Sequence, residues 1–169
     1  AHRMFTGIDT FTLMAIPFFV LAGELMESGG ISRRLFDFAH AIVGFVYGGL
    51  AMVAVVAAMF FAGISGAAAA DTAAVGAVSI PAMIRKGYKK GFAAAVQAAG
   101  GSIGVIIPPS IPMIIFGVVG GVSIGKMFMG GFIPGLLIGG GLMAASYFLA
   151  KKAGYEKDAF MGFREILRT

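Results

Sequence analysis

One carboxylate in a long apolar stretch constrains this chain more than any other feature. Between Phe38 and Ile84 only one side chain is charged at pH 7, that of Asp71, which follows a run of glycine, serine and alanine residues. The flanks, residues 50–61 and 73–84, are apolar enough to lie in a membrane. A charge at that depth is costly, and ionisable residues in membrane segments mark ion or substrate pathways by default. We therefore expect a membrane protein whose functional centre includes Asp71.

The composition agrees with this expectation. The chain has 169 residues, of which 59% are hydrophobic and 12% charged, and its mean hydropathy is +0.93, whereas soluble domains carry about 25% charged residues. The net charge of +5 comes from basic residues beside apolar segments, a pattern typical of membrane orientation signals. The absence of cysteine excludes disulfides and thiolate metal sites. No phosphate-binding loop, nucleophile–base pair or metal-ligand cluster appears, so an enzyme is not expected.

The hydrophobic pattern predicts an all-α integral membrane protein. We expect a first span over residues 8–26, with Asp9 and Glu24 near the interfaces, and a further span over 127–150. Residues 31–47 form an amphipathic pattern suited to the membrane interface, and 159–169 resemble the start of another surface helix. The apolar face of the 31–47 helix comprises Leu35, Phe38, Ile42 and Phe45. The expected units are a scaffold-like part (1–49), a transport-type part (50–122), and a span with a cytoplasmic surface helix (123–169).

Two segments of the middle unit are interrupted. Residues 50–84 are either two spans or a re-entrant hairpin with its tip at 65–70, because one span needs about 20 residues. Residues 91–122 carry no charge, and Pro108 and Pro109 stop the helix that arrives from Phe92. Ser110 is expected to cap a new helix beginning near Ile111. Two interrupted apolar segments indicate a secondary transporter's binding site.

The basic residues test this topology. If residues 50–84 form a hairpin and 92–122 a single broken span, the basic residues divide eleven to two between the two sides. The positive-inside rule then places the larger group in the cytoplasm. That group is Arg33, Arg34, Arg85, Lys86, Lys89, Lys90, Lys151, Lys152, Lys157, Arg164 and Arg168, and the other group is Arg3 and Lys126.

The hairpin tip offers oxygen ligands for a cation and amides for an anion. The preceding helix is expected to end near Gly63 with free carbonyls, and Ser65 and Asp71 add side-chain oxygens that suit sodium. A helix restarting after Ser65 would present unpaired amides at Gly66, Ala67 and Ala68, with its positive dipole end toward an anionic substrate. The alternative is tight helix packing, since Gly63, Ala67 and Asp71 follow the four-residue spacing of membrane helix interfaces.

The proline break offers a second set of backbone groups. It is expected to expose the carbonyls of residues 104–107 and the amides from Ile111 onward, with glycines at 100, 101 and 104 and Ser102 making room for an ion. The alternative is a proline-kinked helix without a ligand. Gln97 lies in an apolar helix, where a packing hydrogen bond is the simpler interpretation.

These motifs resemble the large membrane subunit of tripartite ATP-independent periplasmic (TRAP) transporters, over essentially the whole chain. The segments that carry the resemblance are Met4-Phe5-Thr6-Gly7-Ile8-Asp9, Ile16-Pro17-Phe18-Phe19, Leu21-Ala22-Gly23-Glu24-Leu25-Met26, the 63–71 motif, Ile80-Pro81-Ala82-Met83 and Ile106-Ile107-Pro108-Pro109-Ser110-Ile111-Pro112-Met113. The resemblance implies an elevator-type secondary transporter in which sodium binds between a re-entrant hairpin (50–84) and a broken helix (92–121). It implies no covalent cofactor, with Na⁺ as the coupling ion.

The resemblance also implies a set of site residues and partners. The expected sodium ligands are Gly63, Ser65, Gly66, Asp71, Gly101, Ser102 and Pro108. The expected substrate-binding residues are Ser65, Ala67, Ala68 and Ser110. Expected partners are a small TRAP membrane subunit, a periplasmic substrate-binding protein, the lipid bilayer and a carboxylate such as a C4-dicarboxylate or sialic acid. The expected location is the cytoplasmic (inner) membrane of a bacterium or archaeon.

Two further expectations complete the sequence analysis. The chain starts without methionine and is expected to be the first half of its subunit, without the second, inverted repeat. Other functions stay open: a binding-protein-independent anion symporter, or a cation/proton antiporter in which Asp71 carries the proton. A non-transporting membrane scaffold, with the breaks as packing devices, is a third.

Overall fold

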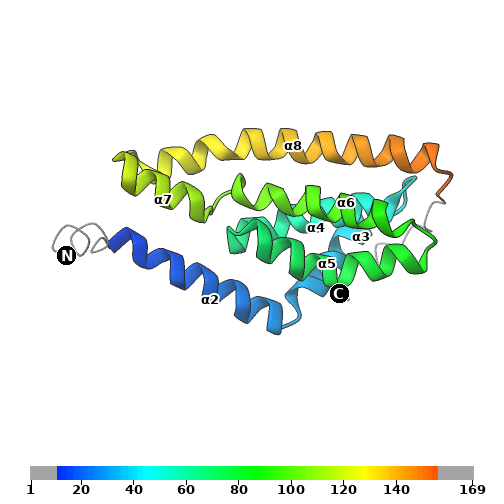
Figure 1. Cartoon of the computed structure of the whole chain (residues 1–169), viewed down its shortest axis with the longest axis horizontal. Helices are drawn as coiled ribbons and strands as arrows, with labels where there is room; N and C mark the ends of the chain where they lie inside the picture. Colours follow the sequence, from blue (N-terminus) through cyan, green and yellow to red (C-terminus); the bar gives the residue numbers. More distant parts are fainter. Residues whose placement is uncertain (1–10, 156–169) are drawn as a thin grey trace.

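The structure is a computed structural model that describes residues 11–155, and in this range the regular secondary structure is helical (Figure 1). The elements are η1 (Phe11–Met14), α2 (Ala15–Ser28), α3 (Ile31–Val43), α4 (Gly49–Ser65), α5 (Ala68–Arg85), α6 (Lys90–Gly101), η2 (Ser102–Val105), α7 (Ile111–Gly120) and α8 (Ile124–Lys152). The all-helical expectation is confirmed for this part of the chain. The predicted surface helix at 159–169, the opening motif at 4–9 and the basic residues Arg3, Lys157, Arg164 and Arg168 lie outside the described residues.

Helix α4 forms the centre of the core. It contacts α3, α5, α6 and α8, and its alanine-rich sequence lets these neighbours approach closely. Ala51, Ala57 and Ala62 have no exposed surface, and Phe61 is 1% exposed. The tight core fixes the ends of α4 and α5, where the candidate site lies.

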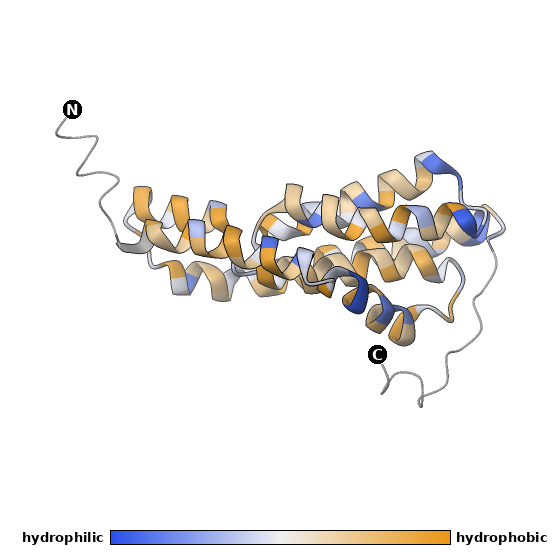
Figure 2. Ribbon diagram, turned by 90° about the horizontal axis from the view of Figure 1, so that it is seen from below, coloured by the Kyte–Doolittle hydropathy of each residue, from blue (hydrophilic) through white to orange (hydrophobic). Residues whose placement is uncertain are grey.

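Helix α8 runs along the molecule (Figure 1). It has 29 residues, and an 18-residue stretch of it has a mean hydropathy of 1.7. Among the described residues it is the one helix with the length and composition to cross a membrane. This agrees with the predicted span at 127–150. Its inner side is a stripe of small residues: Gly131 lies against Ile106, and Gly139 lies against Met59. Its outer side carries large exposed apolar residues. Figure 2 shows that apolar residues are spread along the helices of the whole molecule.

Most basic residues of α5, α6 and α8 lie at one end of the molecule, and their assignment to one side of a membrane stays a prediction. The α5–α6 connection and the end of α8 lie at the same end of the molecule (Figure 1). The Tyr88 and Tyr155 rings stack there with centroids 4.1 Å apart, and the Lys89 backbone amide donates to the Tyr155 hydroxyl at 3.1 Å. Lys126, in the first turn of α8, lies at the opposite end of that helix.

Helix α3 differs from its expected form in length and in the face it buries. It ends at Val43 rather than near Tyr47, because Gly44 closes the helix. The face toward the core carries Phe36 and Ala39, and Phe38 on the predicted apolar face is 43% exposed. Leu35 of the predicted face packs against the core, whereas Phe38, Ile42 and Phe45 are exposed.

Candidate functional site

The tip of the α4–α5 hairpin is closed by its own residues. Gly66 adopts a left-handed conformation (φ 65°) that ends α4, and its amide donates to the Ala62 carbonyl at 3.3 Å. The Ala67 amide donates to Ser65 Oγ at 3.1 Å. The prediction of unpaired amides is therefore wrong for Gly66 and Ala67, two of the three residues it named, because the Ala62 carbonyl and the Ser65 hydroxyl accept from them. Helix α4 also runs two residues beyond the expected end at Gly63.

Asp71 lies in the first turn of α5 and has no exposed surface. The Ser65 hydroxyl donates to its Oδ1. Its Oδ2 has no hydrogen-bond partner among the described residues. A buried carboxylate is costly unless it is paired or coordinates a cation, so this oxygen is an available ligand.

The other side of Asp71 is formed by the region where α6 stops being an α-helix. A β-carbon built on Gly104 would lie 1.9 Å from Asp71 Oδ2, and one on Gly101 would lie 1.9 Å from Thr72 Oγ1. Only glycine allows α5 to approach this closely. The α-helix ends at Gly101, well before Pro108, because η2 follows with three-residue hydrogen bonding. The prediction that the proline pair alone stops this helix is therefore wrong, and the glycines end it first.

The two breaks meet directly. The Ile111 amide, at the start of α7, donates to the Gly66 carbonyl at 3.1 Å. A β-carbon on Gly66 would lie 2.6 Å from the Pro109 carbonyl oxygen, and one on Gly63 would lie 4.0 Å from the Pro108 carbonyl oxygen. Backbone oxygens of the proline turn thus lie at the hairpin tip.

Ser110 holds the break together. Its hydroxyl donates to the Val105 carbonyl at 2.7 Å and accepts the Met113 amide at 3.4 Å, which confirms the predicted helix cap. Ser110 has no exposed surface, so its hydroxyl serves the turn in this conformation. Its role toward a substrate stays a prediction.

A buried polar pair braces the hairpin against α6. The Ser79 hydroxyl donates to Gln97 Oε1 at 2.7 Å, and Gln97 Nε2 donates to the Thr72 carbonyl at 3.5 Å. Both side chains are almost fully buried. The structure therefore confirms a packing hydrogen bond for Gln97. One of its two partners is Thr72, the residue after Asp71.

The structure brings most predicted site residues together, and the ligand roles stay predictions. Ser65, Gly66 and Asp71 form the hairpin side, and Ala67 and Ala68 connect it to α5. Gly101 and Pro108 belong to the facing side. Ser102 is exposed and donates its hydroxyl to the Ala99 carbonyl at 2.7 Å.

Two neighbours of the site were missed by sequence reasoning. Thr72 faces Gly101, and its position follows from the packing of α5 on the end of α6. Glu24, expected at an interface, lines a cavity of about 60 Å³ together with Ser65 and Ala67. Nothing in the sequence around Glu24 indicated this contact.

The set of ligands suits a hard cation. Within residues 11–155, no three His, Cys, Asp or Glu residues come close enough to share a metal ion. The hairpin offers instead the Asp71 carboxylate and the Ser65 hydroxyl, and the carbonyls of Pro108 and Pro109 lie beside Gly63 and Gly66. In transporters with broken helices, unwound backbone carbonyls coordinate sodium and half-helix amino ends face anionic substrates.

Comparison with known proteins gives a consistent assignment. Residues 1–168 match the family model for the DctM component of tripartite ATP-independent periplasmic transporters. The isethionate TRAP transporter permease protein DctMQ of Oleidesulfovibrio alaskensis is 53% identical over 94% of this chain and 25% of its own length. The sialic acid large permease SiaM of Vibrio cholerae is 48% identical over 92% and 36%, respectively. The 2,3-diketo-L-gulonate large permease YiaN of Escherichia coli is 47% identical over 98% and 39%. The chain thus spans a quarter to two fifths of the length of these relatives.

Proposed function

The chain belongs to the DctM family of TRAP transporter components, and from this premise we propose that it forms part of a sodium-coupled permease for an organic carboxylate. The observation that carries the proposal is the buried Asp71 carboxylate, with one oxygen bound to Ser65 and the other unpartnered among the described residues. Members of this family are transporter permeases, so the chain is a membrane transport component and not an enzyme.

In the proposed mechanism, sodium binds first. The Asp71 carboxylate, the Ser65 hydroxyl and carbonyls of the two breaks would hold the ion and draw the breaks together. The Gly66–Ile111 hydrogen bond already links the tip to the broken helix, so an ion there would order both. The ion promotes transport only by binding the competent state more tightly than the other states.

The substrate would bind next to the ordered tip. The first amides of a helix lack intrahelical partners, and the helix dipole favours an anion there. In this chain the first turn of α5 begins at Ala68, so its amides are the proposed contacts for a carboxylate. The names of the relatives refer to C4-dicarboxylate, sialic acid and diketogulonate, which supports a carboxylate substrate. One relative is named for isethionate, a sulfonate, so the chemistry that all four share is that of a small organic anion.

The lengths of the helices support a re-entrant hairpin. Helices α4 and α5 have 17 and 18 residues, which correspond to about 26 Å each, less than the ~30 Å hydrocarbon core. We propose that this hairpin and the broken helix form the moving unit of an elevator. The basic end would face the cytoplasm of a bacterial or archaeal cell. A small membrane subunit and a periplasmic binding protein would complete the system.

The test uses the full-length permease reconstituted with its small subunit and binding protein. Uptake of labelled C4-dicarboxylate or sialic acid should require a sodium gradient. Ser65→Ala removes a hydrogen bond to a charged group, worth about 1.5–3 kcal/mol, and should raise the half-saturating sodium concentration tenfold or more. Ser146→Ala, which changes another buried serine on α8, should leave it unchanged.

Other outcomes would replace the proposal. A pH-driven flux that is indifferent to sodium would indicate an antiporter with Asp71 as proton carrier. Sodium-dependent uptake without the binding protein would indicate a simple symporter. If Ser65→Ala and Ser146→Ala had the same sodium dependence, the ion would not bind at the tip.

A further inference from the structure

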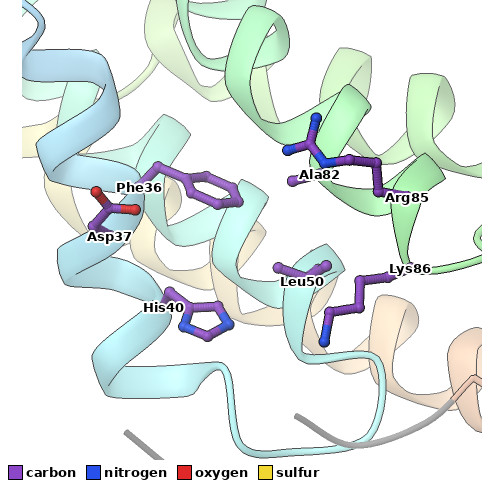
Figure 3. A pocket seen from close by; sticks show the side chains of 7 residues that line it. All are labelled: Phe36, Asp37, His40, Leu50, Ala82, Arg85 and Lys86. Carbon is purple, nitrogen blue, oxygen red and sulfur yellow. The ribbon is translucent and has the colours of Figure 1, made fainter.

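A second cavity lies at the basic end of the molecule, away from the hairpin tip. It has a volume of about 440 Å³, within the range of small-molecule sites. It opens between α3, the beginning of α4 and the end of α5 (Figure 3). Its lining residues are Phe36, Asp37, His40, Leu50, Ala82, Arg85 and Lys86. The transport site uses none of them.

The two walls of this cavity carry opposite charge. Asp37 and His40 come from α3, and Arg85 and Lys86 come from the end of α5 on the facing side (Figure 3). Between the walls lies an apolar floor that includes Leu50, which is 5% exposed. The cavity therefore matches a ligand with a negative group, a positive group and an apolar remainder.

Helix capping alone does not account for this arrangement. Arg85 is the last residue of α5 and Lys86 is its C-cap, where basic side chains complement the helix dipole. That role requires neither a cavity nor a carboxylate on the opposite wall. Asp37 instead opposes the binding of a simple anion, so a ligand that carries its own cation fits better.

The level of the cavity in the proposed membrane orientation favours a lipid. The α5–α6 connection and the end of α8 meet at this end, where Tyr88 and Tyr155 stack, and tyrosine is enriched at membrane interfaces. Phe38 and Ile42 are exposed on the side of α3 that faces away from the cavity. The apolar part of the cavity itself consists of Phe36, Leu50 and Ala82.

We propose that this cavity binds the headgroup of a phospholipid with a primary amine, such as phosphatidylethanolamine. The phosphate would accept hydrogen bonds from Arg85 and Lys86, and the ammonium would donate to Asp37. Arginine suits this role because its planar guanidinium can bind two phosphate oxygens at once. The glycerol would cover Leu50. The inference rests on the proposed membrane orientation, but not on sodium coupling.

The experiment measures lipid retained by the purified full-length permease in detergent, by native mass spectrometry, after incubation with equal amounts of three lipids. Phosphatidylcholine has the same charges as phosphatidylethanolamine but no N–H donor, and phosphatidylglycerol lacks the cation. We expect phosphatidylethanolamine to be retained about tenfold more than phosphatidylcholine, equivalent to about 1.4 kcal/mol.

Two sets of variants test the two walls of the cavity separately. R85Q/K86Q should lower the retention of all three lipids, whereas K89Q/K90Q, with the same change in net charge but outside the lining, should not. Asp37→Asn should abolish the preference for phosphatidylethanolamine over phosphatidylcholine and raise the retention of phosphatidylglycerol. The change in headgroup preference in Asp37→Asn does not depend on the double variant, so it tests the proposed lipid site even if R85Q/K86Q fails to fold.

Three results would overturn the proposal. An equal loss of lipid retention in R85Q/K86Q and K89Q/K90Q would indicate that the lipids are held by diffuse charge attraction. An unchanged headgroup preference in Asp37→Asn would remove the amine contact. Complete displacement of the lipid by millimolar inorganic phosphate would indicate a free-phosphate site. Sodium-dependent uptake, measured in parallel, tests the proposed function separately, because its loss would leave lipid retention unchanged.

Discussion

Replacing Gly104 with alanine is the sharpest perturbation of the proposed ion site. The added β-carbon would lie 1.9 Å from Asp71 Oδ2 and 3.2 Å from the Ala68 Cα. Since real contacts essentially never fall below 3.0 Å, the carboxylate must move by at least 1.1 Å. Ligand distances at a metal site tolerate only about 0.2 Å, so the displaced oxygen can no longer serve a bound ion.

The expected change in the half-saturating sodium concentration depends on which state bears the free-energy cost of the added β-carbon. Overpacking a buried site costs about 1–3 kcal/mol. Without an ion the carboxylate can turn away, so most of the cost falls on the ion-bound state. The half-saturating sodium concentration for uptake should then rise about 5- to 140-fold. Gly140→Ala is the matched control, because a β-carbon there meets nothing within 4 Å.

The assay is sodium-dependent uptake by the full-length permease in proteoliposomes, with the amount of folded permease measured for each variant. Gly140→Ala should keep the wild-type sodium curve. If Gly104→Ala also kept it, the Asp71 oxygen facing Gly104 would not be an ion ligand, and the reasoning from the unpartnered carboxylate would be refuted.

Two further predictions use pairs of glycines in the same way. Gly66→Ala should impair uptake severely, because a left-handed backbone costs alanine about 1–2 kcal/mol and the β-carbon would meet the Pro109 carbonyl at 2.6 Å. Gly121→Ala has the same left-handed backbone but no neighbour within 4 Å, so it should bear only the backbone cost. Equal uptake by the two variants would refute the contact between the breaks. Gly131→Ala should lower the unfolding temperature in detergent, because its β-carbon would lie 2.5 Å from a carbonyl of the break. A β-carbon on Gly130 meets nothing within 4 Å, so Gly130→Ala should leave the unfolding temperature unchanged. An equal fall in unfolding temperature for the two variants would contradict the packing of α8.

The sequence predicted the hairpin tip and the start of α7 well, since both depend on local chemistry. Small residues before Asp71 and the proline pair are strong local signals, and Ser110 caps its helix as expected. The lone charge in an apolar stretch indicated Asp71 as the candidate centre of the site, because burial of a charge is expensive wherever it lies. Its burial and its bond to Ser65 agree with that inference.

The details that failed depend on contacts between distant segments. The amides of Gly66 and Ala67 are paired because Gly66 takes a left-handed conformation and the Ser65 hydroxyl turns back toward Ala67, and neither feature follows from the spacing. The early end of α6 reflects the close approach of α5 to Gly101 and Gly104. The buried face of α3 could not be chosen from periodicity either, because apolar residues occur on more than one side of this helix.

The most direct test of the central claim is the thermal stability of the full-length permease as a function of sodium concentration, with potassium at equal ionic strength as reference. An ion that binds only the folded state stabilises it by about 2.7 kcal/mol at 100 times its dissociation constant. The account predicts that sodium raises the unfolding temperature of the wild type and that Asp71→Asn reduces this rise markedly. Identical sodium curves for the wild type and Asp71→Asn would contradict it.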